Sequence, residues 1–188
     1  MNNILVIPDF YTPEECKAEI WFAERTGFKE QKYGVTHTTE VRRRAYVDNA
    51  ERAAKIYSKL KIPELETFYN GIRPDPFVND LPNWKPVGLN ERLRYYQYKP
   101  GQRFSRHFDI MFRVDDNTRT FLTFIVYLND EFEGGQTIFD SEIIAPKMGS
   151  AILFPHELKH EGAVVTSGCK TVLRSDVIYT CTQNVSNS

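Results

Sequence analysis

The chain has 188 residues, of which 41% are hydrophobic and 13% aromatic, and its formal net charge at pH 7 is −1. This composition predicts one globular domain over residues 1–188 and argues against both the basic surface of a nucleic-acid-binding protein and the apolar run of about 20 residues in a membrane-spanning helix. The start lacks a basic leader, and the three cysteines are too widely spaced for a zinc pattern or a disulfide framework, so we expect a cytoplasmic protein of undetermined oligomeric state.

Residues 1–90 predict helices and loops that support a β core. Thr12-Pro13-Glu14-Glu15 is a capping box with proline at the first helical position, so a helix is expected to begin at Pro13 and to stop at Gly27. Asp48-Asn49-Ala50-Glu51 predicts the start of a second helix, and Pro63 is expected either to end it or to start another short turn. The stretch 70–86 is rich in Pro, Asn, Asp and Gly, which is typical of a long loop that serves as a lid or as a surface connector.

Residues 91–181 predict a β core of about eight short strands separated by Gly and Pro turns. The β-rich segments are residues 92–98, 104–109, 119–129, 136–139, 151–154, 162–165 and 170–180. Short strands at this spacing are typical of a sandwich or a barrel. The expected fold class is therefore mainly β with N-terminal helices (α+β).

Three residues of the β core form a candidate metal site. His107 and Asp109 are two residues apart, so on a strand their side chains would point to the same face, and His160 would join them from another strand. Two imidazoles and one carboxylate suit an Fe(II) site that leaves coordination positions open for other ligands. A histidine and an aspartate paired at the surface are the alternative.

A competing motif overlaps this site. His156-Glu157-Leu158-Lys159-His160 matches the HExxH pattern of zinc hydrolases, which requires a helix to bring both histidines to one face. Pro155 before the motif and Gly162 after it leave too little room for that helix. We therefore expect a chance match, or a His156 that merely neighbours the site.

A basic residue, Lys170, follows ten positions after His160. Lys170 and Arg174 share strand parity and are expected to face the interior together. Because a buried cation needs a partner, an inward Lys170 indicates an anion from solution, such as a dicarboxylate. A resident acid, Asp176 or Glu161, is the alternative partner, and Arg174 is the alternative anchor.

These segments together resemble the prolyl 4-hydroxylase-type Fe(II)/2-oxoglutarate-dependent dioxygenases. The matching stretches are residues 93–109, 123–129, Gly134-Gly135-Gln136-Thr137, residues 146–162 and Lys170. The resemblance implies a double-stranded β-helix (jelly roll) core and Fe(II) bound by His107, Asp109 and His160. It also implies 2-oxoglutarate and O2 as cosubstrates, with ascorbate as a candidate reductant.

The resemblance further implies which residues bind the cosubstrate. Lys170 would hold the distal carboxylate of 2-oxoglutarate, Tyr127 would donate a hydrogen bond to a cosubstrate carboxylate, and Tyr98 would line the site. A core aromatic is the alternative role for Tyr98.

The implied activity is hydroxylation of a C–H bond, with peptidyl proline in a peptide or protein as the favoured substrate and succinate and CO2 as coproducts. A free amino acid or another residue type is the alternative substrate, and a cupin-like metal-binding module without turnover is the alternative class. Residues 1–90 carry no matching motif. The charged runs 42–44 and 130–133 are expected to be solvated surface, with substrate steering as the alternative.

Overall fold

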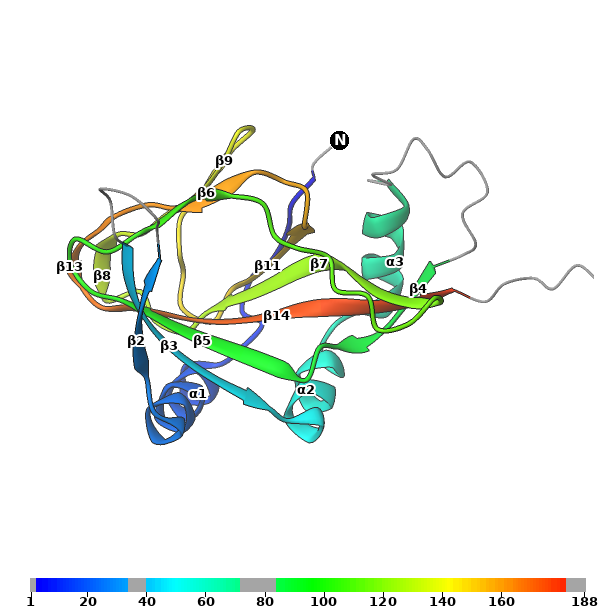
Figure 1. Cartoon of the computed structure of the whole chain (residues 1–188), viewed down its shortest axis with the longest axis horizontal. Coiled ribbons are helices and arrows are strands. Elements are labelled where there is room, and N and C mark those ends of the chain that lie inside the picture. The colour runs from blue at the N-terminus through cyan, green and yellow to red at the C-terminus, as the bar shows by residue number, and fades with distance from the viewer. Residues whose placement is uncertain (1–2, 34–39, 72–83, 182–188) are drawn as a thin grey trace, which may run out of the picture.

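The computed structural model describes residues 3–33, 40–71 and 84–181, and two antiparallel sheets face each other in it (Figure 1). The larger sheet has the strand order β1 (Leu5–Ile7), β11 (Ala151–Pro155), β7 (Thr118–Tyr127), β14 (Lys170–Cys181), β5 (Arg92–Tyr98), β3 (Glu40–Asp48) and β2 (Lys29–Tyr33), and β4 (Trp84–Leu89) pairs with β14. The smaller sheet has the order β10 (Ile143–Ile144), β9 (Thr137–Phe139), β12 (His160–Gly162) and β6 (Phe104–His107). A two-stranded ribbon joins β13 (Val165–Gly168) to β8 (Phe132–Gly134). This arrangement is the expected jelly-roll core.

The helices α1 (Pro13–Thr26) and α2 (Ala50–Tyr57) cover the face of the larger sheet that points away from β6 and β12 (Figure 1). Strand alternation separates two cores. Tyr95 and Leu173 pack among the helices, whereas Tyr96, Tyr98 and Val172 on the same strands pack between the two sheets. The space between the sheets is therefore the interior of the jelly roll.

The predicted start and stop of the first helix are confirmed. The Thr12 hydroxyl accepts from the Glu15 amide at 3.2 Å, and the Glu15 carboxylate accepts from the Thr12 amide at 3.0 Å. Gly27 ends the helix with φ at 91°, a conformation that glycine adopts without a steric penalty. The second predicted helix is also present, with Asn49 as its N-cap.

Several elements of the N-terminal half were not predicted. β2 and β3 extend the larger sheet beyond β5. The second helix ends at Tyr57, before Pro63, and a further helix, α3 (Ile62–Gly71), contains Pro63 in its first turn. β4 begins at Trp84, inside the stretch expected to be a loop; the rest of that stretch, residues 72–83, lies outside the described residues. No helix among the described residues is long and apolar enough to cross a bilayer.

The charged run 42–44 is not simply solvated surface, so that expectation was wrong. Arg42 is 4% exposed, and its guanidinium covers the ring of Phe104. Arg43 donates to Gln97 at 2.6 Å and Arg44 lies over Tyr46. Long arginine stems pack on apolar surface while the charged groups stack on rings or bond to polar atoms. In the run 130–133, by contrast, Asp130, Glu131 and Glu133 are exposed as expected.

Candidate active site

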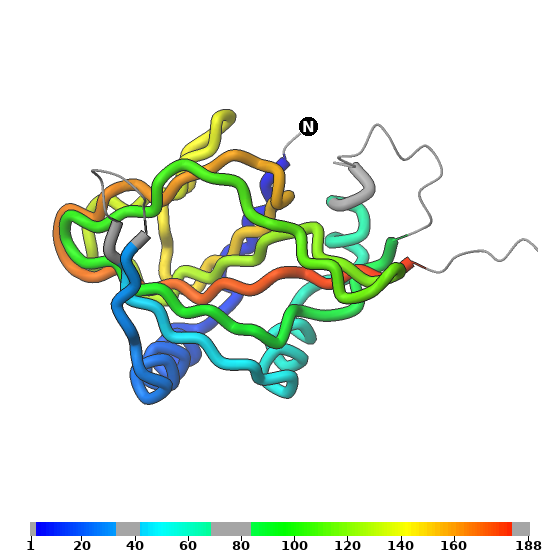
Figure 2. The backbone as a smooth tube through the Cα atoms, viewed as in Figure 1, coloured from blue at the N-terminus to red at the C-terminus, as the bar shows by residue number. Residues whose placement is uncertain are grey.

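The side chains of His107, Asp109 and His160 meet at one point between the sheets. One ligand atom of each lies within 4.8 Å of the others. His107 on β6 is the direct cross-strand partner of His160 on β12, and Figure 2 shows these two segments, green and orange, running side by side. The predicted convergence of the three residues is therefore present.

The route by which Asp109 reaches this point differs from the expectation. β6 ends at His107, so Asp109 does not share a strand face with it. Instead, the Asp109 amide donates to the His156 carbonyl at 2.9 Å, which turns the chain and directs the carboxylate back toward the histidines. The three residues converge as predicted, but Asp109 reaches the histidines from the segment after β6 and not by alternation along one strand.

Both histidines present the same ring nitrogen to the centre. Nδ1 of His107 donates to the Ser105 carbonyl and Nδ1 of His160 to the Leu158 carbonyl, each at 2.8 Å. A carbonyl only accepts, so Nδ1 carries the proton and the Nε2 lone pair is free to bind a metal. The two Nε2 atoms lie 3.6 and 3.7 Å from the carboxylate oxygens of Asp109.

This donor set fits Fe(II). Two imidazole nitrogens and one carboxylate are the ligands of non-haem iron sites with open positions. Nε2 of His107 is buried and has no hydrogen-bond partner among the described residues, as expected of an atom kept for a metal. Burial lowers the pKa of His160 to about 4, so its imidazole is neutral near pH 7 and able to coordinate.

The Asp109 carboxylate is held by two donors. Thr123 donates to Oδ2 at 2.5 Å, and the Arg174 guanidinium contacts Oδ1 at 2.9 Å. Burial raises the pKa of this carboxyl, but the contact with His107 and the charge of Arg174 outweigh it and hold the pKa well below its usual range. Asp109 is therefore an anion at every physiological pH.

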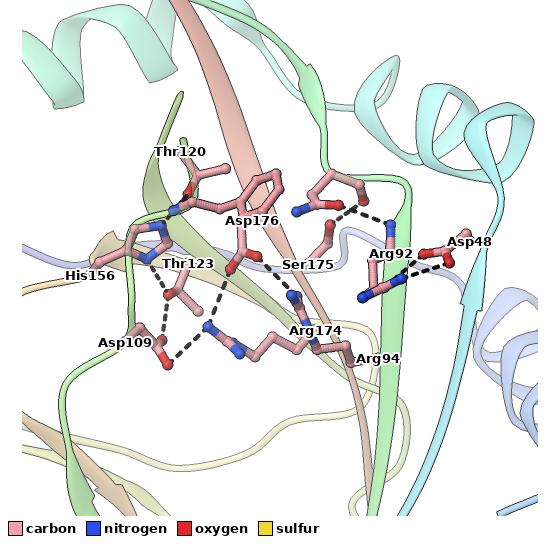
Figure 3. Close-up of polar contacts among 12 residues, drawn as sticks. Asp48, Arg92, Arg94, Asp109, Thr120, Thr123, His156, Arg174, Ser175 and Asp176 are labelled. Carbon is pink, nitrogen blue, oxygen red and sulfur yellow. Dashed lines mark hydrogen bonds and ion pairs between the residues drawn. The ribbon is translucent and has the colours of Figure 1, made fainter. Parts of the chain in front are cut away.

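Arg174 points into the interior as its parity predicted, but it is committed to resident acids. It contacts Asp109 and also Asp176 at 3.2 Å, and Arg94 contacts Asp176 at 2.9 Å (Figure 3). Two arginines and two carboxylates thus neutralise one another beneath the site. This arrangement makes Arg174 a weaker candidate than Lys170 for binding an incoming anion.

Lys170 is a buried cation for which the described residues provide no carboxylate partner. It is 5% exposed, and its ammonium donates to the Gly135 carbonyl at 2.5 Å. No ion pair within residues 3–33, 40–71 and 84–181 includes it. Asp176, one of the two acids considered as its partner, forms ion pairs with Arg94 and Arg174 instead. Burial lowers the pKa of Lys170 to about 7, the value of a cation that lacks a counter-ion.

A pocket connects Lys170 to the metal ligands. Its lining includes His107, His160, Tyr98, Tyr127, Thr137, Lys170 and Arg174. The Tyr127 hydroxyl lies 2.7 Å from the Thr137 hydroxyl, and the Lys170 ammonium lies 5.3 Å from the centre of the Tyr127 ring. Burial raises the pKa of both Tyr98 and Tyr127, so their hydroxyls keep their protons and remain available as donors.

The HExxH segment is not a helix. β11 ends at Pro155 and β12 begins at His160, with turns between them. The His156 imidazole bonds to Thr120 and Thr123 rather than joining His160, so the zinc-hydrolase geometry is excluded. Of the two expectations for this motif, the second is confirmed, because His156 neighbours the site without joining the metal ligands. The roles of Thr120, Thr123 and Phe104 were not anticipated, because they depend on strand register.

The chain is similar to known proteins in sequence. Residues 93–175 match the family model described as the 2OG-Fe(II) oxygenase superfamily, and this range contains all three metal-ligand positions and also Lys170. A curated relative, "Probable prolyl 4-hydroxylase 10" of Arabidopsis thaliana, is 28% identical over 79% of this chain. The chain spans 56% of the length of that relative.

Solved structures share the fold. The viral collagen prolyl hydroxylase of Paramecium Bursaria Chlorella virus-1, in its 2OG complex, is 21% identical with a TM-score of 0.56, covering 96% of this chain and 97% of that one. A prolyl hydroxylase of Trichoplax adhaerens, in complex with a hypoxia inducible factor peptide fragment, is 16% identical with a TM-score of 0.60, covering 94% and 84%. At these identities the likeness shows the jelly-roll fold.

Proposed function

The chain belongs to the 2OG-Fe(II) oxygenase superfamily, and on that premise we propose that it hydroxylates peptidyl proline with Fe(II), 2-oxoglutarate and O2. The observation that carries this proposal is the convergence of His107, Asp109 and His160 beside a buried Lys170 that lacks a carboxylate partner among the described residues. A metal-binding site and an anion-binding site joined by one pocket suit a chelating dicarboxylate.

Each residue has a defined task in this proposal. His107, Asp109 and His160 would hold Fe(II). When bound, Fe(II) and 2-oxoglutarate supply the oxidation of a substrate C–H bond by O2, with one oxygen atom entering the product and the other entering succinate as CO2 is released. Lys170 would bind the distal carboxylate of 2-oxoglutarate, and Tyr127 would donate a hydrogen bond to it. The buried aromatic walls of the pocket would exclude water.

A proline-containing peptide or protein is the substrate we propose. The named relatives with prolyl hydroxylase activity in their descriptions support this choice. Large apolar side chains are also available next to the site for a chain-like substrate, because Phe108 and Ile110 flank Asp109 and are 56% and 86% exposed. Single exposed apolar residues are common, but two that flank a ligand position are placed to meet a peptide.

The direct test is turnover. The purified protein is incubated with Fe(II), 2-oxoglutarate, ascorbate and a library of proline-containing peptides, and mass spectrometry follows the gain of one oxygen atom while succinate is quantified. We expect succinate and oxygenated peptide in equal amounts, and loss of both in Asp109→Ala and His160→Ala.

Two results would contradict the proposal. Succinate formation that survives either substitution would show that the metal ligands are misassigned. Oxygen gain on peptides without proline, but never on those with it, would exclude proline as the target while leaving the oxygenase chemistry intact.

A further inference from the structure

His156 is buried and bonded at both ring nitrogens, yet it is not a metal ligand. It is 3% exposed, with Nδ1 2.9 Å from the Thr123 hydroxyl and Nε2 3.0 Å from the Thr120 hydroxyl (Figure 3). Thr123 in turn donates to Oδ2 of Asp109 at 2.5 Å. The imidazole therefore lies one side chain away from the metal-binding carboxylate.

The number of protons available on each group determines the direction of the hydrogen bonds that link Asp109, Thr123, His156 and Thr120. An ionised carboxylate only accepts, so the single hydroxyl proton of Thr123 points to Asp109. Thr123 can then only accept from His156, which places a proton on Nδ1. In a neutral imidazole Nε2 is then the acceptor, so Thr120 donates to it, while the Thr120 oxygen also accepts from the Phe112 amide at 2.9 Å.

The opposite tautomer would weaken the hold on the carboxylate. With the proton on Nε2, the Nδ1 lone pair would compete with Asp109 for the one hydroxyl proton of Thr123. The hydroxyl of a threonine rotates to suit its partners, so its direction is set by what surrounds it. The tautomer with the proton on Nδ1 is therefore the one that leaves the Thr123 proton to Asp109, and the Thr120 hydroxyl can donate its own proton to Nε2.

His156 also holds Asp109 through the main chain. Its carbonyl accepts from the Asp109 amide at 2.9 Å, and its own amide donates to the Phe121 carbonyl at 3.0 Å on β7. One residue therefore fixes both the backbone and, through Thr123, the carboxylate of Asp109. Residues that orient a metal ligand from behind typically change metal affinity or activity by about 10–100-fold when they are replaced.

We propose that His156 is a positioning residue that, by donating from Nδ1 to Thr123, fixes the Asp109 carboxylate in the orientation that binds the metal. The proposal rests on the metal-binding part of the proposed function. It assigns a task to the first histidine of the HExxH pattern, whose glutamate and helix have no counterpart in this site.

Two substitutions at position 156 distinguish the contribution of Nδ1 from that of Nε2. The amide nitrogen of His156→Asn reaches the place of Nδ1 and can still donate to Thr123. The longer side chain of His156→Gln places its amide nearer to Nε2 and Thr120. Thr123→Ser and Thr123→Val form a second pair, in which only serine keeps the hydroxyl proton for Asp109.

The test is the affinity of the metal-free protein for Mn(II), titrated by the electron paramagnetic resonance signal of free Mn(II), with thermal unfolding recorded for every variant. We expect His156→Gln and Thr123→Val to raise the Kd for Mn(II) by about 10–100-fold. His156→Asn and Thr123→Ser should stay close to the wild type. The Thr123 pair decides the matter if a His156 variant does not fold.

Equal Kd values for asparagine and glutamine at position 156, or for serine and valine at position 123, would overturn the proposal. Succinate formation by the wild type is measured in the same preparation with Fe(II) and 2-oxoglutarate. A wild type that binds Mn(II) with the expected order of variants but forms no succinate would refute the proposed activity and leave the role of His156 standing.

Discussion

The guanidinium of Arg42 lies 3.5 Å from the centre of the Phe104 ring. The same ring stacks on His107 at 3.6 Å with an interplanar angle of 13°, so the two planar groups must occupy its opposite faces. Arg42 belongs to β3, which the sequence did not reveal, and His107 is a metal-ligand position. The N-terminal part of the chain is therefore in indirect contact with the site.

Replacing Arg42 tests this stack. Arg42→Leu removes a cation from the face of a partly buried ring, an interaction that contributes about 0.5–2 kcal/mol. We expect a lower free energy of unfolding and weaker Mn(II) binding, because the Phe104 ring that supports His107 loses one of its two covers. Denaturant unfolding and Mn(II) titration measure the two effects.

The control for Arg42 is an exposed pair of the same chemistry. The Arg25 guanidinium lies 4.8 Å from the centre of the Trp21 ring. Both residues belong to α1, on the face of the larger sheet that points away from the site (Figure 1). Arg25→Leu should leave Mn(II) binding unchanged. If Arg42→Leu also leaves it unchanged, the stack has no part in positioning His107.

Gly135 offers a second test, of the space around Lys170. Its φ is 65°, and a Cβ added there would meet Cδ of Lys170 at 3.0 Å. Gly135→Ala should displace the ammonium and weaken 2-oxoglutarate binding, which an anaerobic titration of the Mn(II)-loaded protein measures. The backbone strain of alanine at positive φ adds a cost of about 1 kcal/mol.

Gly101 is the matched position. Its φ is 83°, and nothing lies within 4 Å of an added Cβ. Gly101→Ala therefore carries the strain without the clash, and we expect it to reduce stability while leaving 2-oxoglutarate affinity unchanged. Equal loss of affinity in the two variants would mean that strain, rather than displacement of Lys170, is responsible.

The affinity for 2-oxoglutarate should depend on pH through Lys170. Burial lowers the pKa of this ammonium to about 7 in the free protein, so it is charged below that pH and increasingly neutral above it. Binding of a carboxylate above pH 7 must then include uptake of a proton, and the Kd is expected to rise by up to about tenfold per pH unit. Titrations between pH 6 and pH 9 measure this.

The control is Lys170→Met, which cannot titrate. It should bind 2-oxoglutarate weakly and with the same Kd across this range. A wild-type Kd that does not change with pH, or a slope that persists in Lys170→Met, would place the responsible proton on another group.

Arg174 should be more important for stability than for the cosubstrate. Arg174→Leu leaves Asp109 and Asp176 buried without one of their cations, and removing one partner of a buried ion pair costs about 3–5 kcal/mol. Urea unfolding should show this loss. The exposed pair of Arg92 and Asp48, also visible in Figure 3, is the control, because solvent screens an exposed ion pair and leaves it little effect on stability. A smaller loss for Arg174→Leu than for Arg92→Leu would contradict this view.

Residue chemistry made part of the site predictable. His107 and His160 are two of only four histidines, and with Asp109 they form a pattern that suits one kind of metal, while Lys170 follows at an inward strand position. Arg174 was also placed inward correctly, but its partners Asp109 and Asp176 could not be derived, because they depend on how the strands pair.

The features that the sequence did not reveal are those that depend on register or on unusual composition. Thr123 is paired with Phe154, two residues before His156, and this cross-strand register brings the threonine to the imidazole. β3 contains three consecutive arginines, which composition alone assigns to solvent. Local patterns do not report that an aromatic ring lies opposite.

β14 carries Lys170 and Arg174 on the side of the pocket and Leu173 on the side of the helices. If one residue were added or removed between positions 170 and 174, every following side chain of the strand would move to the opposite face of the sheet. An arginine would then lie among α1 and α2, and an apolar side chain would lie beneath the metal ligands. Length variation in this protein is thus tolerable in the turns that flank the strand, whereas inside β14 a single indel would disrupt folding and cosubstrate binding in one step.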